Sequence, residues 1–388
     1  MSLLRSVLLP RWSRRHKEAA PVPPLAPPSD ADPELIRKLA WIRSSAAGDR
    51  PLSVFMDQNN RCNLKCRMCG FSDARMAALA KYDLPWSLFE KIADQVFSKA
   101  HFVCLSLMTE PFMTRDFPDR LALVKRAGVP YSEIITNGTL LNETNLAKVL
   151  AAEISRLTVS IDGGTKEVFE AIRTGARFEH VVGNVRLFQA MRRARGAVRP
   201  RLRFNHVLSE RNIDHFEEFL RFAEEIRPEE LGVRTVSRMS DAEIQESQDP
   251  LFWKKVVSAR QRLAAFCART GIEDSGYLRD RPSRIVLVDA SGEGMMCRTP
   301  WDTFAIHANG DVFPCIAWSR PPVGNLVLQS FEEIWNGEAL GRLRREFAET
   351  RPGVDCLHCT VRRGGDDPDD DFFYRKVAKP LPFSSIPG

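Results

Sequence analysis

The chain has 388 residues, of which 44% are hydrophobic and 27% are charged, and its formal net charge is +6. This length suits one large globular domain and a second, smaller one. No apolar run approaches the roughly 18 residues that a membrane-spanning helix needs. The basic stretch at 192–203 lacks aromatic residues for base stacking, so neither a transmembrane protein nor a nucleic-acid-binding protein is favoured.

The N-terminal stretch 1–30 is rich in arginine and proline. Its apolar piece at 6–9 is too short for the hydrophobic region of an export signal, and charges follow it. We therefore expect a flexible tail, with a weak interfacial anchor as the alternative. The division of the chain that we predict is an N-terminal extension (1–50), a core (51–236), a helical connector (237–291), a C-terminal domain (292–365) and an acidic, proline-rich tail (366–388).

The core alternates predicted strands with amphipathic helices. The predicted strands are 52–56, 102–108, 131–136, 157–161, 202–207 and 231–236. The predicted helices are 86–99, 116–127, 142–152, 165–172, 178–193 and 212–227. Repeated βα units build a parallel sheet whose carboxyl edge carries the functional residues. Six units are too few for an eight-fold barrel of ordinary curvature.

Three cysteines follow the first predicted strand with the spacing C-x3-C-x2-C: Cys62, Cys66 and Cys69. Thiolates suit iron, and a [4Fe-4S] cluster normally takes four of them. Three would leave one iron with an open position that a small chelating ligand can occupy. The alternatives are a structural zinc knuckle, a disulfide with one spare thiol, and three unrelated core cysteines.

Polar residues also follow the next strands. Glu110 lies in Met-Thr-Glu-Pro after the second strand, and Asn137 lies in Thr-Asn-Gly after the third. Ser160 and Asp162 end the fourth strand, two residues apart and therefore on one face, which suits contact with ribose hydroxyls. Read alone, the glutamate is a solvated acid and Thr-Asn-Gly a helix-entry turn. No G-x-G-x-x-G follows a strand, which argues against a dinucleotide-binding fold.

A helix is predicted at 250–270, and a second cysteine group lies beyond it: Cys297, Cys315, Cys356 and Cys359. Asn-Gly at 309–310 predicts a hairpin that places Cys297 and Cys315 at the same end of a two-stranded ribbon. Four thiolates can hold zinc or a complete iron-sulfur cluster, and the spacing favours neither. The nine cysteines are an odd number without an export signal, which indicates a reducing, cytoplasmic compartment.

The cysteine spacing after a strand resembles the cluster motif of the radical S-adenosylmethionine (radical SAM) superfamily. The resemblance implies a partial (β/α)6 barrel, similar to a TIM barrel, that binds SAM at the open iron. Met68 lies where the family has an apolar residue before the third cysteine. Thr109 and Glu110 match the family's Gly-Gly-Glu-Pro turn, with threonine replacing glycine, and would meet the methionyl amine. Asn137 resembles the family's Thr-Asn-Gly turn, and Arg173 resembles an arginine that meets the SAM carboxylate.

The C-terminal region resembles the SPASM and twitch extensions of radical SAM enzymes. The hairpin at 301–315, Gly-Asn-Leu at 324–326 and the helix-like 331–336 carry this resemblance. Full SPASM domains have seven cysteines and two auxiliary clusters. The four cysteines here imply one fully ligated auxiliary [4Fe-4S] cluster. The acidic tail is expected to be solvated, with a lid over the auxiliary cluster as the alternative.

The resemblance implies reductive cleavage of SAM by an external one-electron reductant of the flavodoxin or ferredoxin type. The resulting 5′-deoxyadenosyl radical would abstract hydrogen from a substrate carbon, and the auxiliary cluster would accept an electron, which makes a net oxidation. The substrate is a small molecule or a partner-delivered peptide, as in radical SAM/SPASM peptide maturation. A non-catalytic iron-sulfur or zinc scaffold is the competing class. The sequence assigns no catalytic acid or base.

Overall fold

The computed structural model describes residues 52–73, 79–235, 250–275, 278, 285–288, 294–297, 299–316, 318 and 321–348. For residues 250, 285–288, 294–297, 347 and 348 it describes the backbone alone. The predictions for the N-terminal extension, the acidic tail and the C-x2-C pair at 356 and 359 lie outside these residues.

Ten strands form the central sheet, in the order β12-β11-β10-β1-β2-β3-β4-β5-β6-β7, and β8 and β9 form a separate antiparallel pair. The strands are β1 (Leu52–Met56), β2 (Ala100–Cys104), β3 (Tyr131–Thr136), β4 (Arg156–Ser160), β5 (Arg201–Leu208), β6 (Glu230–Thr235), β7 (Glu273–Asp274), β8 (Ile285–Val288), β9 (Gly294–Cys297), β10 (Thr303–Ile306), β11 (Asp311–Phe313) and β12 (Gly324–Asn325). All neighbours from β10 to β7 are parallel, and β11 and β12 are antiparallel additions.

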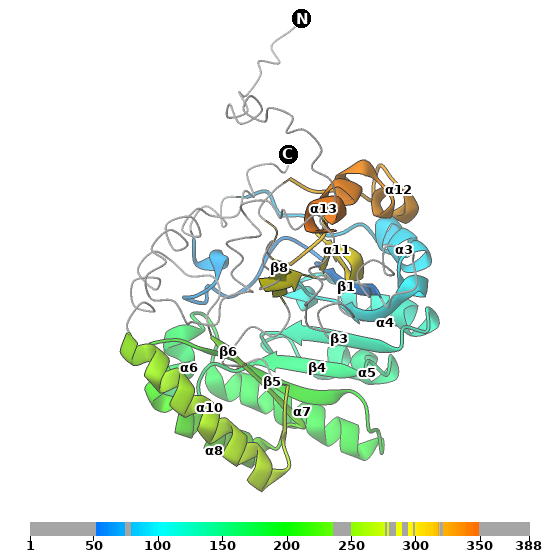
Figure 1. Cartoon of the computed structure of the whole chain (residues 1–388). Helices are drawn as coiled ribbons and strands as arrows, with labels where there is room; N and C mark the ends of the chain where they lie inside the picture. The colour runs from blue at the N-terminus through cyan, green and yellow to red at the C-terminus, as the bar shows by residue number, and fades with distance from the viewer. Residues whose placement is uncertain are drawn as a thin grey trace, which may run out of the picture.

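Helices connect the parallel strands, as βα units require (Figure 1). They are α3 (Trp86–Gln95), α4 (Phe117–Arg126), α5 (Glu143–Ala151), α6 (Lys166–Ile172), α7 (Phe178–Ala194), α8 (Phe216–Ile226) and α10 (Pro250–Thr270), followed by α11 (Thr299–Asp302), α12 (Phe331–Trp335) and α13 (Glu338–Ala348). Side-chain caps fix several starts: Asn142 accepts from the amide of Asn145, and Ser330 forms a capping box with Glu333.

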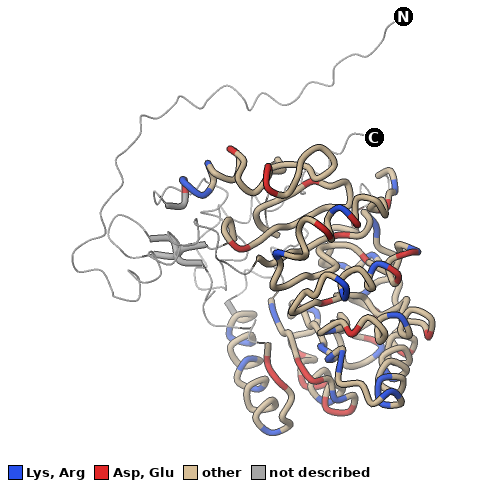
Figure 2. The backbone as a smooth tube through the Cα atoms, turned by 90° about the vertical axis from the view of Figure 1, so that its right-hand side faces the viewer, with Lys and Arg blue, Asp and Glu red and all other residues tan. Residues whose placement is uncertain are grey.

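The two faces of the sheet differ in chemistry because alternate strand residues point to opposite sides. On the helix-covered face, Phe204 of β5 stacks on Phe222 of α8. On the other face, Glu133 of β3 pairs with Arg156 of β4 and Arg203 of β5. The apolar core therefore lies between sheet and helices, and a buried charge network lies inside the curve of the strands. Outside the core, acidic and basic residues are interspersed along the helices (Figure 2).

The expected (β/α)6 core is confirmed, and the second strand is the one whose bounds differ most from the prediction. We predicted the second strand to continue to residue 108, but β2 ends at Cys104. The reason is that the amides of Leu107, Met108 and Thr109 turn to donate to the carboxylate of Asp57. A backbone that bonds to one carboxylate oxygen in this way cannot also continue the ladder.

The C-terminal hairpin forms, and Cys297 lies outside it, in a separate strand pair. β10 and β11 pair antiparallel around the Asn-Gly turn at 309–310, and Cys315 follows β11. Cys297 instead ends β9, which pairs with β8, and the short helix α11 separates β9 from β10. No pattern within residues 297–306 predicts that β9 pairs with β8, or that β10 pairs in parallel with β1 of the core, because both partners lie elsewhere in the chain.

Candidate functional site

The loop after β1 holds the first three cysteines in a fixed register. Leu64 is 1% exposed and anchors the loop in the core. The amides of Lys65 and Arg67 donate to the carbonyls of Thr174 and Ile172, both at 3.0 Å. Cys66, between the two, is therefore held against the end of α6. Six described cysteines, these three among them, form no disulfide.

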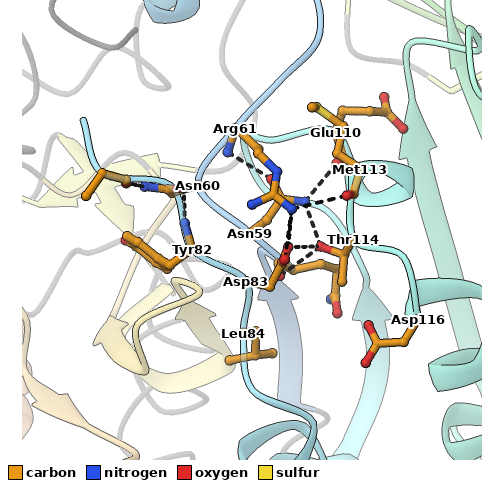
Figure 3. Close-up of polar contacts among 12 residues, drawn as sticks. Asn59, Asn60, Arg61, Tyr82, Asp83, Leu84, Glu110, Met113, Thr114 and Asp116 are labelled. Carbon is orange, nitrogen blue, oxygen red and sulfur yellow. Dashed lines mark hydrogen bonds and ion pairs between the residues drawn. The ribbon is translucent and has the colours of Figure 1, made fainter. Parts of the chain in front are cut away.

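A strap at 79–84 crosses the residues before the first cysteine (Figure 3). Asn59 bridges to Asp83, and its amide group donates to the hydroxyl of Thr114 at 2.9 Å. Arg61 pairs with Asp83 at 2.7 Å and donates to the carbonyl of Met113 at 3.2 Å. The cysteine loop is thus braced on one side by the strap and on the other by the turn at 110–114.

Asp57, directly after β1, binds the segment 107–109 that leads into the turn at 110–114. Its Oδ1 atom accepts from the amides of Leu107, Met108 and Thr109 at 2.9–3.1 Å, and from the hydroxyl of Thr109 at 2.8 Å. Thr109 therefore uses its side chain here, which glycine could not do. Asp57 is not among the site residues predicted from the sequence. The sequence does carry a signal for it: Asp57 is a polar residue directly after a predicted strand, as Glu110 and Asn137 are polar residues that follow the next strands.

Glu110 is 2% exposed, so it is not the solvated acid that its isolated sequence context suggests. One carboxylate oxygen accepts from the Thr136 hydroxyl at 2.7 Å and from the Phe112 amide, and the other accepts from the Asn137 amide at 2.8 Å. Burial raises the pKa of Glu110 to about 7, partly offset by these hydrogen bonds. Two oxygens offer about four acceptor positions, so one position remains for a ligand.

Asn137 and Arg173 reach the cysteine sulfurs directly. The Asn137 side chain donates to Sγ of Cys62 at 3.7 Å, and the amide of Leu64 donates to the same sulfur at 3.5 Å. The guanidinium of Arg173 lies 3.9 Å from Sγ of Cys66. Donors aimed at sulfur are the contacts that tune an iron-sulfur cluster.

The other predicted SAM contacts lie around this loop. Arg173 pairs with Asp162 at 2.7 Å, and the second oxygen of Asp162 accepts from the Val207 amide at 2.8 Å. Ser160 ends β4 and is 8% exposed, and Met68 packs against the core from within the loop. A hydrogen bond therefore joins Glu110 to Asn137, and an ion pair joins Asp162 to Arg173. That all these residues bind SAM stays a prediction.

The three cysteines suit a metal centre that binds thiolates. Burial raises the pKa of the Cys62 thiol to about 12, and burial also raises the pKa of Cys66, so deprotonation there needs a metal. Within the described residues, no three Cys, His, Asp or Glu side chains converge closely enough to hold one metal ion. Three thiolates can hold three of the four irons of a [4Fe-4S] cluster.

Comparison with known families decides what this arrangement is. Residues 58–223 match the family model of the radical SAM superfamily, and residues 297–360 match that of the SPASM iron-sulfur cluster-binding domain. The chain contains a radical SAM domain and a SPASM domain. Its cofactors are SAM, the [4Fe-4S] cluster that binds it, and an auxiliary [4Fe-4S] cluster. The SPASM match includes all four cysteines of the second group.

Relatives and solved structures extend the similarity beyond the core. The chain is 27% identical to PqqA peptide cyclase of Xanthomonas euvesicatoria over 309 residues, which is 76% of this chain and 77% of that protein. It is 24% identical to AdoMet-dependent heme synthase of Methanosarcina barkeri, over 77% of this chain and 86% of that one. Streptococcus suis SuiB bound to its precursor peptide SuiA shares the fold, with a TM-score of 0.60 at 18% identity, covering 84% of this chain and 74% of SuiB.

The described part of this radical SAM protein includes no helix with the length and hydropathy needed to cross a membrane. Of the second cysteine group, Cys315 is half-buried directly after the hairpin. For Cys297 the structure describes the backbone, and Cys356 and Cys359 lie outside the described residues. The ligand set of the auxiliary cluster therefore stays a prediction, supported by the span of the SPASM match.

Proposed function

We propose that this radical SAM protein oxidises a residue of a peptide substrate. The observation that carries the proposal is the similarity to PqqA peptide cyclase, which extends over 309 residues and so continues well past the 58–223 core match. SuiB, whose fold the chain shares, was crystallised with its precursor peptide SuiA bound. The peptide alternative of the sequence analysis is therefore favoured over the small molecule.

The residues of the core would divide the work at the SAM cluster. Cys62, Cys66 and Cys69 would hold three irons, and the open position would take the methionyl group of SAM. Glu110 has one acceptor position left beside the Asn137 amide, which suits the methionyl ammonium. When bound, the cluster and SAM supply the 5′-deoxyadenosyl radical that takes a hydrogen atom from a substrate carbon.

The SPASM domain would complete the oxidation. After hydrogen abstraction, the substrate must lose one more electron and one proton to become a closed-shell product. An auxiliary cluster held by four cysteines has no open position for SAM, so it suits the role of electron acceptor. We assign its ligands to Cys297, Cys315, Cys356 and Cys359. The electron that starts the reaction would come from a flavodoxin- or ferredoxin-type protein, and a reducing, cytoplasmic compartment suits both clusters.

A small-molecule oxidation is the second candidate, favoured by the similarity to AdoMet-dependent heme synthase.

We also propose the domain boundaries that the sequence predicts. In that division α10 is a connector, yet β7, which follows it, joins the sheet beside β6. Residues 250–275 thus add a helix and one further parallel strand, β7, beside the six predicted strands.

The proposal is tested in two stages. Anaerobically reconstituted protein with SAM and dithionite should release 5′-deoxyadenosine, which a non-catalytic scaffold would not do. Peptide and metabolite pools are then compared between cells with the gene and cells carrying a variant with alanine at Cys62, Cys66 and Cys69. A peptide that is lighter by two hydrogens only in the first strain supports the proposal. A change confined to small metabolites contradicts the peptide substrate and leaves the radical chemistry standing.

A further inference from the structure

One arginine and one aspartate form a buried pair beside the SAM cluster's second cysteine. Arg173 caps the C-terminal end of α6, and its side chain is 11% exposed, while that of Asp162 is fully buried. One terminal nitrogen of the guanidinium pairs with Asp162 at 2.7 Å. The other terminal nitrogen lies 3.9 Å from Sγ of Cys66. The sulfur here stands for the thiolate that ligates iron.

The pair cannot easily move away from the sulfur. Oδ1 of Asp162 accepts from the Val207 amide at 2.8 Å, and its backbone carbonyl accepts from the Asn212 side chain at 3.0 Å. The residues on either side of Cys66 donate their amides to the residues on either side of Arg173. The distance between Cys66 and the guanidinium is therefore set by backbone hydrogen bonds on both partners.

Charge distinguishes Cys66 from Cys62. Cys62 receives neutral donors, the amide of Leu64 and the side chain of Asn137. Cys66 faces a guanidinium, which stays protonated at any pH the protein experiences. Reduction adds one negative charge to the cluster, so a nearby cation favours the reduced state and a nearby anion opposes it. Salt screens buried charges little, so both electrostatic effects on the cluster persist at physiological ionic strength.

We propose that Arg173 and Asp162 together set the reduction potential of the SAM cluster through Cys66. Arg173 raises the potential, and Asp162 holds the guanidinium in place while offsetting part of its charge. The inference rests on the three-cysteine cluster and not on the proposed peptide substrate. It also differs from the predicted SAM contacts of the two residues, because it needs no SAM.

The experiment is a redox titration of the reconstituted holoenzyme without SAM, followed by electron paramagnetic resonance. The spectrum of the variant with alanine at Cys62, Cys66 and Cys69 is subtracted to remove the auxiliary cluster. Arg173→Gln should make one-electron reduction about tenfold less favourable, which is about 59 mV toward lower potential. Arg173→Lys keeps the charge and should recover at least half of that shift. Asp162→Asn should move the potential in the opposite direction.

Asp116→Asn is the matched control. Asp116 also pairs with a buried arginine, Arg120, at 2.9 Å, but this pair lies at the N-terminal end of α4, whereas Cys66 is held against the end of α6. This control should leave the potential unchanged. An unchanged potential in Arg173→Gln overturns the proposal, and so does a fall in potential in Asp162→Asn. Opposite shifts cannot come from general damage to the fold, and none of these readouts depends on a peptide substrate.

Discussion

The two cysteine groups of this protein are built in different ways. The three core cysteines lie within one loop, Cys62 to Cys69, which is held at both ends by backbone hydrogen bonds. The other group runs from Cys297 to Cys359 and draws on β9, the end of the hairpin, and the chain beyond α13. A ligand set inside one loop can be recognised from its spacing. A dispersed set depends on how separate elements come together.

The sheet relates the two groups to each other. β10 pairs in parallel with β1, so the loop that carries Cys62 and the turn after β10 both begin at the carboxyl ends of these strands. β11 then returns antiparallel, so Cys315 lies toward the amino ends of β1 and β10. Four residues of β10 span about 13 Å. Cys315 is therefore set back, by about the length of this strand, from the end of the sheet where the Cys62 loop begins.

The largest effect should follow from removing the core group. Replacing Cys62, Cys66 and Cys69 together by alanine should abolish release of 5′-deoxyadenosine, because no open iron remains for SAM. Bound iron should fall from about eight to about four per chain, one four-iron cluster being lost. Chromatography and an iron assay measure both. Cys267→Ala, a half-buried cysteine on α10, serves as the control and should change neither. Cleavage that persisted in the triple variant would refute the assignment.

Removing the dispersed group should separate cleavage from product. Replacing Cys356 and Cys359 by alanine should spare part of the SAM cleavage and eliminate oxidised product, because the substrate radical loses its electron acceptor. Mass spectrometry of the product measures the effect. Metal loss can also unfold a domain, so circular dichroism and the spectrum of the SAM cluster must match those of the wild type. Wild-type product formation by such a folded variant would exclude the electron-accepting role.

Glu110 offers a smaller effect within the core. Its pKa is raised to about 7 by burial, and a cationic methionyl ammonium is bound by the ionised carboxylate. SAM affinity should therefore rise with pH, by about tenfold between pH 6 and pH 8, as the ionised fraction rises from about one tenth to nine tenths. Equilibrium binding measures this. Glu110→Gln should flatten the profile while keeping any titration of SAM itself. Equal slopes in the two proteins would exclude the contact.

The smallest effect concerns the attachment of the C-terminal domain to the core. Lys91 of α3 donates to the carbonyls of Leu326 and Gln329, at 2.6 and 3.0 Å. Lys91→Met should lower the free energy of unfolding by about 2 kcal/mol, the range for hydrogen bonds from a charged group. Lys148→Met, which removes an exposed pair with Asp119, should cost under about 1 kcal/mol. Urea denaturation compares them, and equal losses would mean that Lys91 does not join the two regions.

Much of the core could be predicted because its signals are local. Alternating apolar strands and capped helices identified the six βα units, and β1 and β3 have the predicted bounds. Polar residues at strand ends pointed to Glu110 and Asn137, which do come together. The error at β2 arose because the carboxylate of Asp57 captures three amides from a segment 50 residues further along. No periodicity within that segment reports such a contact.

What the sequence by itself determined is the chemistry: the number and spacing of the cysteines set which cluster has an open position. Tertiary structure alone decided which charges surround it. Asp162 and Arg173 were both predicted to face SAM, but folding pairs them with each other and brings the guanidinium to the sulfur of Cys66. It also joined the hairpin to β1 and moved Cys297 to another sheet. Spacing reports ligands that share a loop, whereas charge pairing and strand order depend on segments far apart in the chain.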